Sequence, residues 1–220
     1  MNKIVVIGAR AVSQRIVNKN LRKLGEYPLI VHTLQIAKEL NLPTYVSSDS
    51  EEILDLVEYW SDFNTIKRPA ELASDTATDL DWIKHLLKEF DTLPEQLIFL
   101  RPTTPLRNIK VVKNAISIFD PDRYTSLRSV HELSESSFKT FTIEQGILKG
   151  FSDEYKDQPN QLVPPTYSGN GYVDILVTQQ ILENNTLYGN SIMPFITQHT
   201  VEIDTPNDLL YANWLQKEKI

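Results

Sequence analysis

Basic side chains cluster directly after the first apolar segment of the chain. Residues 3–8 are short, β-branched and bounded by Gly8, which is typical of a buried parallel strand. Arg10, Arg15 and Lys19 follow within ten residues. Open α/β sheets bind ligands at the C-terminal ends of their strands, so three cations there suggest a polyanion, most simply a nucleoside triphosphate. A solvated basic loop is the alternative interpretation.

The composition of the chain limits the classes of protein to which it can belong. A chain of 220 residues is long enough for a full hydrophobic core. Its net charge of −7 argues against general nucleic-acid binding and makes the basic opening more notable. It contains no Cys, no signal-peptide pattern and no apolar run of the ~20 residues that a membrane helix needs. We therefore expect a cytoplasmic protein that binds neither membranes nor nucleic acids.

Apolar periodicity predicts alternating strands and helices over the first 120 residues, and these elements must position the basic loop. Strands are expected at 4–7, 44–47, 64–67 and 96–100, and helices at 28–40, from 51 onward, at 79–90 and at 108–119. Such alternation implies βαβ units and a parallel sheet with right-handed crossovers. The prediction is an α/β fold in which residues 1–220 form a single domain.

The pattern changes after residue 120. A strand is expected at 124–130, a hairpin from 138–143 and 147–151, a long loop at 152–171, a strand at 172–177, and helices at 178–184 and 207–217. The segment from about 130 to 170 therefore reads as an antiparallel excursion from the α/β core. Excursions of this kind often form a lid or a dimer arm.

Two proline-containing loops follow the third and fourth predicted strands, at 67–78 and 100–107. Proline fixes the backbone φ angle, so these loops hold their arginines at defined angles. The alternative for the first is a connecting loop in which Asp75 or Thr78 caps the next helix. The alternative for the second is a stiff surface turn with Arg107 bonded to carbonyl oxygens.

A pair of acidic residues, Glu202 and Asp204, precedes the last predicted helix. Two carboxylates at positions i and i+2 of a strand share one face, which suits Mg²⁺ held beside phosphates. Helix capping and complementation of the helix dipole form the alternative interpretation.

Five motifs, taken in order, resemble those of the acylneuraminate cytidylyltransferases. These are the CMP-sialic acid synthetases and their relatives that activate other 3-deoxy-2-keto sugar acids. The matching residues are Ala9, Arg10, Ser13, Lys19 and Asn20, then Arg68, Pro69, Leu72, Ala73, Asp75 and Ala77, then 101–107, 170–175 and 202–208. The resemblance implies a Rossmann-like three-layer α/β/α nucleotidyltransferase fold with a mostly parallel sheet and an antiparallel dimerisation arm.

The resemblance also implies an activity and a set of roles. CMP would pass from CTP to the hydroxyl of a sialic-acid-like 2-keto-3-deoxy sugar acid, for surface glycan synthesis, with release of pyrophosphate. The enzyme would use Mg²⁺ and form a homodimer. The implied roles are catalysis and phosphate contact for Arg10 and Lys19, nucleotide binding for Ser13, Asn20, Arg68 and Ala77, acceptor binding for Arg101 and Lys139, and metal binding for Glu202 and Asp204.

Several positions depart from the family pattern. Val12 stands where small residues let the backbone approach phosphate, and Gln14 replaces a lysine. Arg101 replaces a glutamine, and Glu202 replaces an aspartate. Two alternatives therefore stand beside the sugar-acid enzyme: a cytidylyltransferase whose acceptor carries phosphate, which Arg101 would suit, and a non-catalytic nucleotide- or sugar-binding relative.

Overall fold

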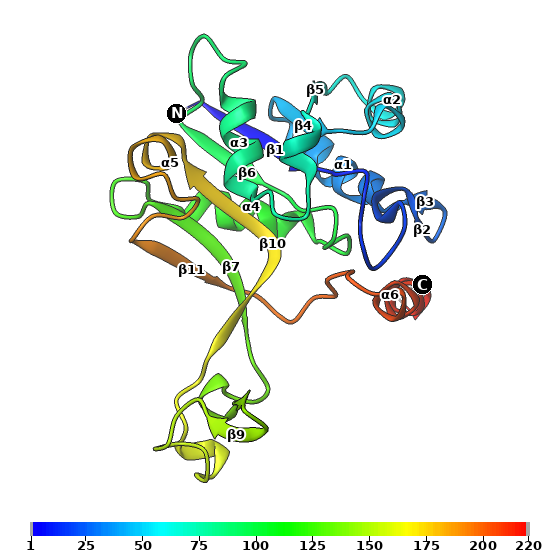
Figure 1. Cartoon of the computed structure of the whole chain (residues 1–220). Coiled ribbons are helices and arrows are strands. Elements are labelled where there is room, and N and C mark those ends of the chain that lie inside the picture. Colours follow the sequence, from blue (N-terminus) through cyan, green and yellow to red (C-terminus); the bar gives the residue numbers. More distant parts are fainter. Residues whose placement is uncertain (1, 219–220) are drawn as a thin grey trace.

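A seven-stranded sheet forms the centre of the computed structural model, which describes residues 2–218 (Figure 1). Its strand order is β11-β7-β10-β6-β1-β4-β5. The strands are β1 (Lys3–Gly8), β4 (Thr44–Ser48), β5 (Asn64–Lys67), β6 (Gln96–Phe99), β7 (Ser126–Glu132), β10 (Tyr167–Val177) and β11 (Ile192–Ile196). Only β10 runs antiparallel to its neighbours in this sheet, so the expectation of a mostly parallel α/β fold is confirmed.

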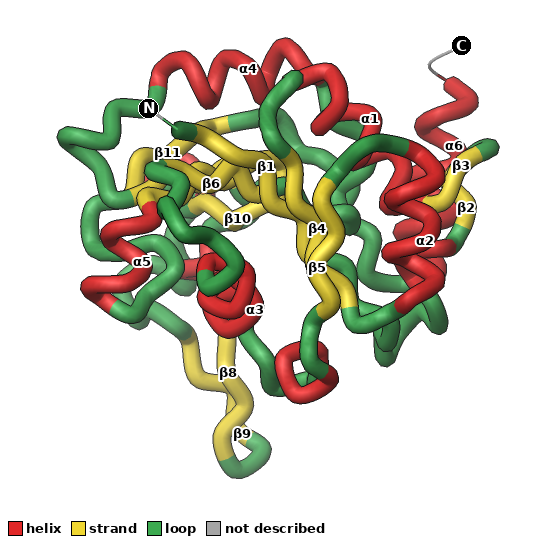
Figure 2. The backbone as a smooth tube through the Cα atoms, turned by 90° about the horizontal axis from the view of Figure 1, so that it is seen from above, coloured by secondary structure: helices red, strands yellow, loops and turns green. Residues whose placement is uncertain are grey.

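Helices cover both faces of the sheet, which makes three layers (Figure 2). The helices are α1 (Leu29–Leu40), α2 (Glu51–Trp60), α3 (Asp79–Leu87), α4 (Ile109–Ile118), α5 (Thr178–Asn184) and α6 (Pro206–Glu218). The apolar sides of α1, α2 and α4 pack in one core cluster and those of α3 and α5 in another, because successive strand side chains point to opposite faces. Among the described residues, no helix combines the length and the apolar character needed to cross a bilayer.

Local sequence signals explain where several elements begin. Ile4 to Ile7 are buried on both faces of the sheet, as a continuous apolar run in a parallel strand requires. The Ser50 side chain caps α2 by accepting from the N–H of Ile53. Thr78 and Asp81 form a reciprocal capping box at the start of α3. Thr78, rather than Asp75, is therefore the cap of that helix.

The last helix joins the core through a cluster of its own. Leu24, in the small hairpin of β2 (Lys23–Leu24) and β3 (Tyr27–Pro28), packs with Leu29, Val201, Ile203 and Ala212. The segment before α6 is thereby drawn back under the first loop. This packing brings chain segments about 180 residues apart to the same edge of the sheet.

An arm extends from the core between β7 and β10 (Figure 1). It carries a two-stranded hairpin of β8 (Phe141–Glu144) and β9 (Ile147–Gly150), which pair antiparallel with Glu144 opposite Ile147. Gly146 supplies the positive φ of +79° that the tight turn needs. The predicted hairpin is confirmed, and its strands are shorter than the expected 138–143 and 147–151.

Several elements differ from the sequence-based expectation. Strand β10 begins at Tyr167, not at residue 172, because 167–169 pair with 130–132 of β7 and extend the sheet into the arm. Strand β11 was not predicted; it is a short edge strand containing Pro194, which edge strands tolerate. Helix α3 ends at Leu87. Residues 201–204 belong to no strand, so the expectation that Glu202 and Asp204 share a strand face is wrong.

The parallel strands deliver the chemistry-bearing loops to one edge of the sheet. Strands β1, β4, β5 and β6 all run in the same direction, so the loops that follow them start side by side. The basic loop follows β1, and the two proline-containing loops follow β5 and β6. The topology therefore places at one edge the segments that the sequence singled out.

Gly171 provides a test of how tightly this edge is built. It adopts a φ of +62°, and a Cβ atom there would lie 2.9 Å from the buried Thr104 hydroxyl oxygen. Gly171→Ala should lower the free energy of unfolding by about 2 kcal/mol, from backbone strain plus the close contact. The measurement is urea unfolding followed by circular dichroism.

Gly146→Ala is the matched control, because its φ is also positive but nothing lies within 4 Å of the added Cβ. It should cost about 1 kcal/mol, from strain alone. Equal losses at the two positions would show that the close packing around Gly171 has no energetic weight.

Candidate active site

The loop after β1 is shaped by its own side chains. The Asn20 amide donates to the Arg10 carbonyl at 3.0 Å, and the Ala11 N–H donates to the Asp49 carboxylate at 2.8 Å. Asn20 is buried, and it holds the loop backbone in place. Its expected contact with a ribose or base stays a prediction.

The first loop, which follows β1, contacts the second loop, residues 67–78, through one carboxylate. The Asp75 oxygens accept from Arg10 Nη1 at 3.3 Å and from Gln14 Nε2 at 2.6 Å. Both partners of the Arg10 pair are substantially exposed, and ion pairs of this kind contribute about 0.2–1 kcal/mol. Ser13 is half-buried in the same loop, whereas the Val12 side chain is 64% exposed. Gln14, the residue in the family's lysine position, thus contacts the aspartate that also binds Arg10.

The first loop also meets the segment before α6. Lys19 Nζ donates to the Ile203 carbonyl and to Asp204 Oδ1, both at 3.0 Å. Arg15 Nη1 lies 3.6 Å from Asp204 Oδ2. The Asp204 N–H in turn donates to the Asp208 carboxylate. The structure therefore brings together Lys19 and Asp204, two residues that the sequence assigned to one site from opposite ends of the chain.

Arg68 lies beneath this edge instead of projecting from it. Its Nε donates to the Ser47 hydroxyl at 3.1 Å and its Nη2 to the Ser47 carbonyl at 3.0 Å. The guanidinium lies 4.9 Å from the Trp82 ring centroid. Burial lowers the pKa of Arg68 to about 10, against the opposing effect of nearby carboxylates. Ala77 lies one residue before the Thr78 cap, and its N–H donates to the Ser74 carbonyl at 3.2 Å.

Arg107 is buried and holds the third loop, residues 100–107, in place. Its guanidinium donates to the carbonyls of Arg101, Gly171 and Tyr172 and to the Thr33 hydroxyl, at 2.5–3.1 Å. Burial lowers the pKa of Arg107 to about 9, which leaves the group charged at neutral pH. The alternative of an arginine bonded to carbonyls is thus confirmed, although the turn that it holds is not on the surface.

Arg101 is engaged by two carboxylates. Nη1 donates to Asp174 at 2.5 Å, and Nη2 donates to Asp79 and to the Tyr188 hydroxyl, both at 3.1 Å. The guanidinium stacks 4.0 Å from the centroid of Phe99. Burial disfavours the charged form, but the carboxylates outweigh it and raise the pKa of Arg101. Acceptor binding by Arg101 stays a prediction, and any acceptor would meet a guanidinium whose charge is already offset.

Glu202 lies beside Asp204 and next to the loop that follows β6. The Thr103 hydroxyl donates to it at 3.5 Å. Partial burial, together with the negative charge of Asp204, raises the pKa of the Glu202 carboxyl. Two carboxylates that repel each other in this way favour a shared cation.

Lys139 is not brought to this edge by its own chain. It lies in the arm, between β7 and β8, and its Nζ donates to the Asn160 amide oxygen at 2.7 Å. Its assignment as an acceptor-binding residue is untested by the contacts within one chain.

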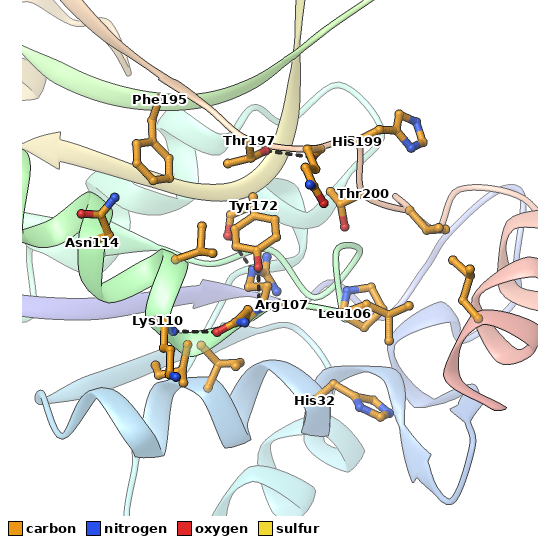
Figure 3. Close-up of a pocket in the computed structure, with 18 of the residues that line it drawn as sticks. His32, Leu106, Arg107, Lys110, Asn114, Tyr172, Phe195, Thr197, His199 and Thr200 are labelled. Atoms are coloured by element: carbon orange, nitrogen blue, oxygen red, sulfur yellow. Dashed lines mark hydrogen bonds between the residues drawn. The ribbon is translucent and has the colours of Figure 1, made fainter. Parts of the chain in front are cut away.

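A separate groove opens on the side of α1 and α4 (Figure 3). It has a volume of about 1340 Å³ and is lined by parts of α1, 105–111, 195–201 and α6. Tyr172 and Arg107 lie at the centre of the close-up in Figure 3. Arg10, Lys19 and Arg68 do not line this groove. The candidate active site is therefore the sheet edge where the loops after β1, β5 and β6 start, and not this groove.

Sequence reasoning missed three residues of the site. Asp174 had a local signal, since it is a lone charge inside an apolar strand and is 1% exposed in the structure. A buried carboxylate requires a partner, which could have directed attention to Arg101. Asp79 and Tyr188 carried no comparable signal, because their contacts depend on the packing of α3 and α5 against β6 and β10.

The likeness to known proteins agrees with this geometry. The sequence is similar to a CMP-N,N'-diacetyllegionaminic acid synthase of Legionella pneumophila, 29% identical over the whole chain and 96% of that protein. It is also 28% identical to an N-acylneuraminate cytidylyltransferase of Escherichia coli over 98% of the chain. The chain spans about half the length of that relative.

Solved structures give the same fold. A CMP:2-keto-3-deoxy-manno-octonic acid synthetase complexed with CTP superposes with a TM-score of 0.77 at 16% identity over the full length of both chains. A 4-diphosphocytidyl-2C-methyl-D-erythritol synthase from Anaerococcus prevotii superposes with a TM-score of 0.68 at 11% identity, over 98% of each chain. Residues 4–146 match the family described as Cytidylyltransferase, and the chain belongs to that family and is an enzyme of that type.

Proposed function

We propose that the protein transfers CMP from CTP to the hydroxyl of a sialic-acid-like 2-keto-3-deoxy sugar acid and releases pyrophosphate. The observation that carries this proposal is the meeting of Lys19 with Asp204 at the C-terminal edge of the parallel strands. A cation and a carboxylate adjoin there, as a phosphate chain with its counter-cation requires. The names of the similar proteins support the substrate class.

The reaction needs positioned charge rather than a protein nucleophile. An acceptor hydroxyl oxygen forms a bond to the α-phosphorus of CTP, the bond between that phosphorus and the bridging oxygen breaks, and pyrophosphate leaves. The hydroxyl proton passes to solvent. In this proposal Arg10 and Lys19 contact the phosphates and stabilise the charge that develops on the leaving group. The cytosine is placed beside the backbone at Ala77, above the buried Arg68, and Ser13 and Asn20 complete the nucleotide subsite.

The carboxylates of Glu202 and Asp204 fit Mg²⁺. Mg²⁺ is commonly held by one or two carboxylates together with substrate phosphates, and the pKa of Glu202 is raised first by burial and then by the negative charge of Asp204, both of which a bound cation would oppose. Among the described residues, no cluster of three or more His, Cys, Asp or Glu side chains could hold the ion alone. Bound Mg²⁺ would supply charge neutralisation of the phosphates. Lys19, released from Asp204, would then be free to contact phosphate.

The acceptor subsite is proposed to lie on the Arg101 side of the edge, with Lys139 supplied by the arm of a second copy. The Arg101 charge is offset by Asp174 and Asp79, and this weighs against the alternative of a phosphorylated acceptor. The arm supports a homodimer through its apolar hairpin. The hairpin and the residue after it expose large apolar side chains, and such exposure typically marks a protein contact; these side chains, between 52% and 74% exposed, are Phe141, Ile143, Ile147, Leu148 and Phe151.

Pyrophosphate release is the direct test of this function. The protein should release pyrophosphate with CTP, MgCl₂ and a 2-keto sugar acid, and much less with ATP, GTP or UTP. Lys19→Ala should reduce kcat/KM by about 10²–10³-fold, because a cation facing the transferring phosphates is lost. Lys113→Ala, on the exposed side of α4, should leave the rate unchanged.

Release that is indifferent to every sugar acid would contradict the proposed acceptor. Release that requires a sugar phosphate would favour the phosphorylated-acceptor alternative. CTP binding without turnover would favour the non-catalytic one.

The raised pKa of Glu202 predicts a pH-dependent gain in stability on its removal. The folded protein holds this proton more tightly than the unfolded chain, so the contribution of the group is present at low pH and is lost as pH rises through the folded pKa. Glu202→Gln should therefore have a higher thermal unfolding midpoint than the wild type at about pH 8. The difference should vanish at about pH 4.

MgCl₂ at about pH 8 should raise the wild-type midpoint more than that of Glu202→Gln. The exposed Glu89→Gln serves as the control for removing a carboxylate. A variant that is less stable than the wild type at every pH would show that the Glu202 charge is not under repulsion.

If the hairpin forms the dimer contact, a single substitution in it should dissociate the dimer. Leu148→Asp places a charge in the apolar hairpin and should convert the dimer to a monomer in sedimentation velocity. Tyr59→Asp, at a highly exposed site on α2 outside the arm, should leave the dimer intact. A wild-type protein that sediments as a monomer would contradict the proposed contact.

A further inference from the structure

Two aromatic rings, flanked by a guanidinium at each end, lie beneath the candidate site. The Arg68 guanidinium lies 4.9 Å from the Trp82 ring, Trp82 lies edge-on to Phe99 at 5.4 Å, and Arg101 lies 4.0 Å from Phe99. Asp79 links Trp82 to Arg101, because its two oxygens accept from Trp82 Nε1 and from Arg101 Nη2. The guanidinium of Arg101 is therefore held from one face and from one edge.

Asp174 holds the other edge of Arg101 from inside the sheet. It is 1% exposed, and its Oδ2 accepts from Arg101 Nη1 and from the Tyr188 hydroxyl at 2.9 Å. Its Oδ1 accepts from the Ser129 N–H at 3.3 Å. All the donors on the Asp174 carboxylate come from different segments, so its position is fixed by the fold and not by solvent.

Tyr188 closes a triangle with this pair. Its hydroxyl also accepts from Arg101 Nη2 at 3.1 Å, and its ring lies 4.4 Å from the Arg128 guanidinium. The burial of the hydroxyl and its contact with Asp174 raise the pKa of Tyr188 to about 12, so it remains a donor at neutral pH. A neutral hydroxyl adds direction to the network without adding charge.

The charge of Arg101 is more than offset by its direct ion-pair partners. Arg101 contacts two carboxylates, so the cluster of Arg101, Asp174 and Asp79 carries a net charge of −1, while the guanidiniums of Arg68 and Arg128 lie against the rings of Trp82 and Tyr188. The side chain of Arg101 nevertheless remains 19% exposed, so part of the guanidinium can still be reached. A monoanionic acceptor meets a directed donor there, whereas a phosphate dianion is repelled more strongly by the two carboxylates that contact Arg101.

We propose that Asp174 is a positioning residue that, with Tyr188, fixes the Arg101 guanidinium and offsets its charge, so that the acceptor end selects a monoanionic sugar acid over a phosphorylated sugar. This inference rests on the proposed function, since it concerns the acceptor of that reaction. Asp174 contacts no acceptor itself and acts through Arg101.

A double-variant cycle tests whether Asp174 acts through Arg101. Asp174→Asn, Arg101→Gln and the double variant are compared with the wild type by pyrophosphate release, with N-acetylneuraminic acid and other 2-keto sugar acids as acceptors. Asp174→Asn should raise the acceptor KM at least tenfold and leave the KM for CTP within about twofold. The acceptor KM of the double variant should be no higher than that of Arg101→Gln alone, because Asp174 then has no guanidinium to position.

Selectivity is the readout that a merely structural role would not move. Asp174→Asn raises the net charge of the cluster from −1 to zero, so the preference for the sugar acid over glucose 1-phosphate should fall by at least fivefold. Tyr188→Phe, which keeps the ring and removes only the hydroxyl, should raise the acceptor KM about threefold. This milder variant carries the test if Asp174→Asn does not fold.

Three results would overturn the inference. The first is a double variant in which the effects of the two single substitutions on the acceptor KM add up, and the second is an equal rise in KM for CTP and for acceptor. The third is unchanged selectivity in Asp174→Asn or, where that variant does not fold, an unchanged acceptor KM in Tyr188→Phe. If the wild type turns over no acceptor, the proposed function fails, and the same variants are titrated with N-acetylneuraminic acid in the presence of CTP. If the dissociation constants of the variants follow the predicted cycle, the inference stands although the proposed function has failed. If no variant and no wild-type protein shows saturable binding, the inference fails as well.

Discussion

The buried guanidinium of Arg107 is the constraint on which the active-site edge depends. A guanidinium without water must donate to protein acceptors, because unpaired donors and an uncompensated charge in the interior are strongly unfavourable. Arg107 meets this requirement with three carbonyls and one hydroxyl, drawn from the third loop, β10 and α1. The loop that follows β6 and the start of the apolar part of β10 are therefore held in one arrangement, which sets where Arg101 and Asp174 meet.

The charges at the edge fall into two classes with different energetic weight. Those of Arg101 and Asp174 are buried, paired and stacked, so they define geometry. Those of Arg10 and Arg15 are accessible and are paired with Asp75 and Asp204, whereas the Lys19 side chain is 14% exposed and is paired with the more accessible Asp204. Accessible pairs of this kind are weak and exchange partners at low cost. A rigid buried network beneath an exchangeable surface network suits a site that must receive a polyanion and keep its acceptor end fixed.

Local periodicity was sufficient to predict most of the core and the first loop. The β1, β4, β6 and α1 segments are apolar on the faces that the sheet requires, and the hairpin turn at Gly146 carries its own signal. Strand β11 escaped prediction because its pairing with β7 brings together segments about 65 residues apart, and it contains Pro194. The contacts of Asp174 escaped it for the same reason, since a strand pattern identifies a buried position and not the partner across the sheet.

The segment 201–204 shows why a correct residue assignment can rest on a wrong local geometry. The sequence placed Glu202 and Asp204 at the site by treating them as neighbours on a strand face. In the structure no strand forms there, because Ile203 is buried against Leu24 and Leu29 and its carbonyl accepts from Lys19. The proximity of the two carboxylates to the first loop thus arises from packing of the chain before α6. Motif order carried that information, and local spacing did not.

The most direct measurement is a crystal structure of the protein with CTP and MgCl₂. The account predicts the triphosphate along the first loop beside Arg10 and Lys19, with the metal between Glu202 and Asp204 and the cytosine near Ala77. Lys19 should have exchanged Asp204 for a phosphate oxygen. A nucleotide bound instead in the groove between α1 and α4, with the pairs of Lys19 and Arg10 unchanged, would contradict it.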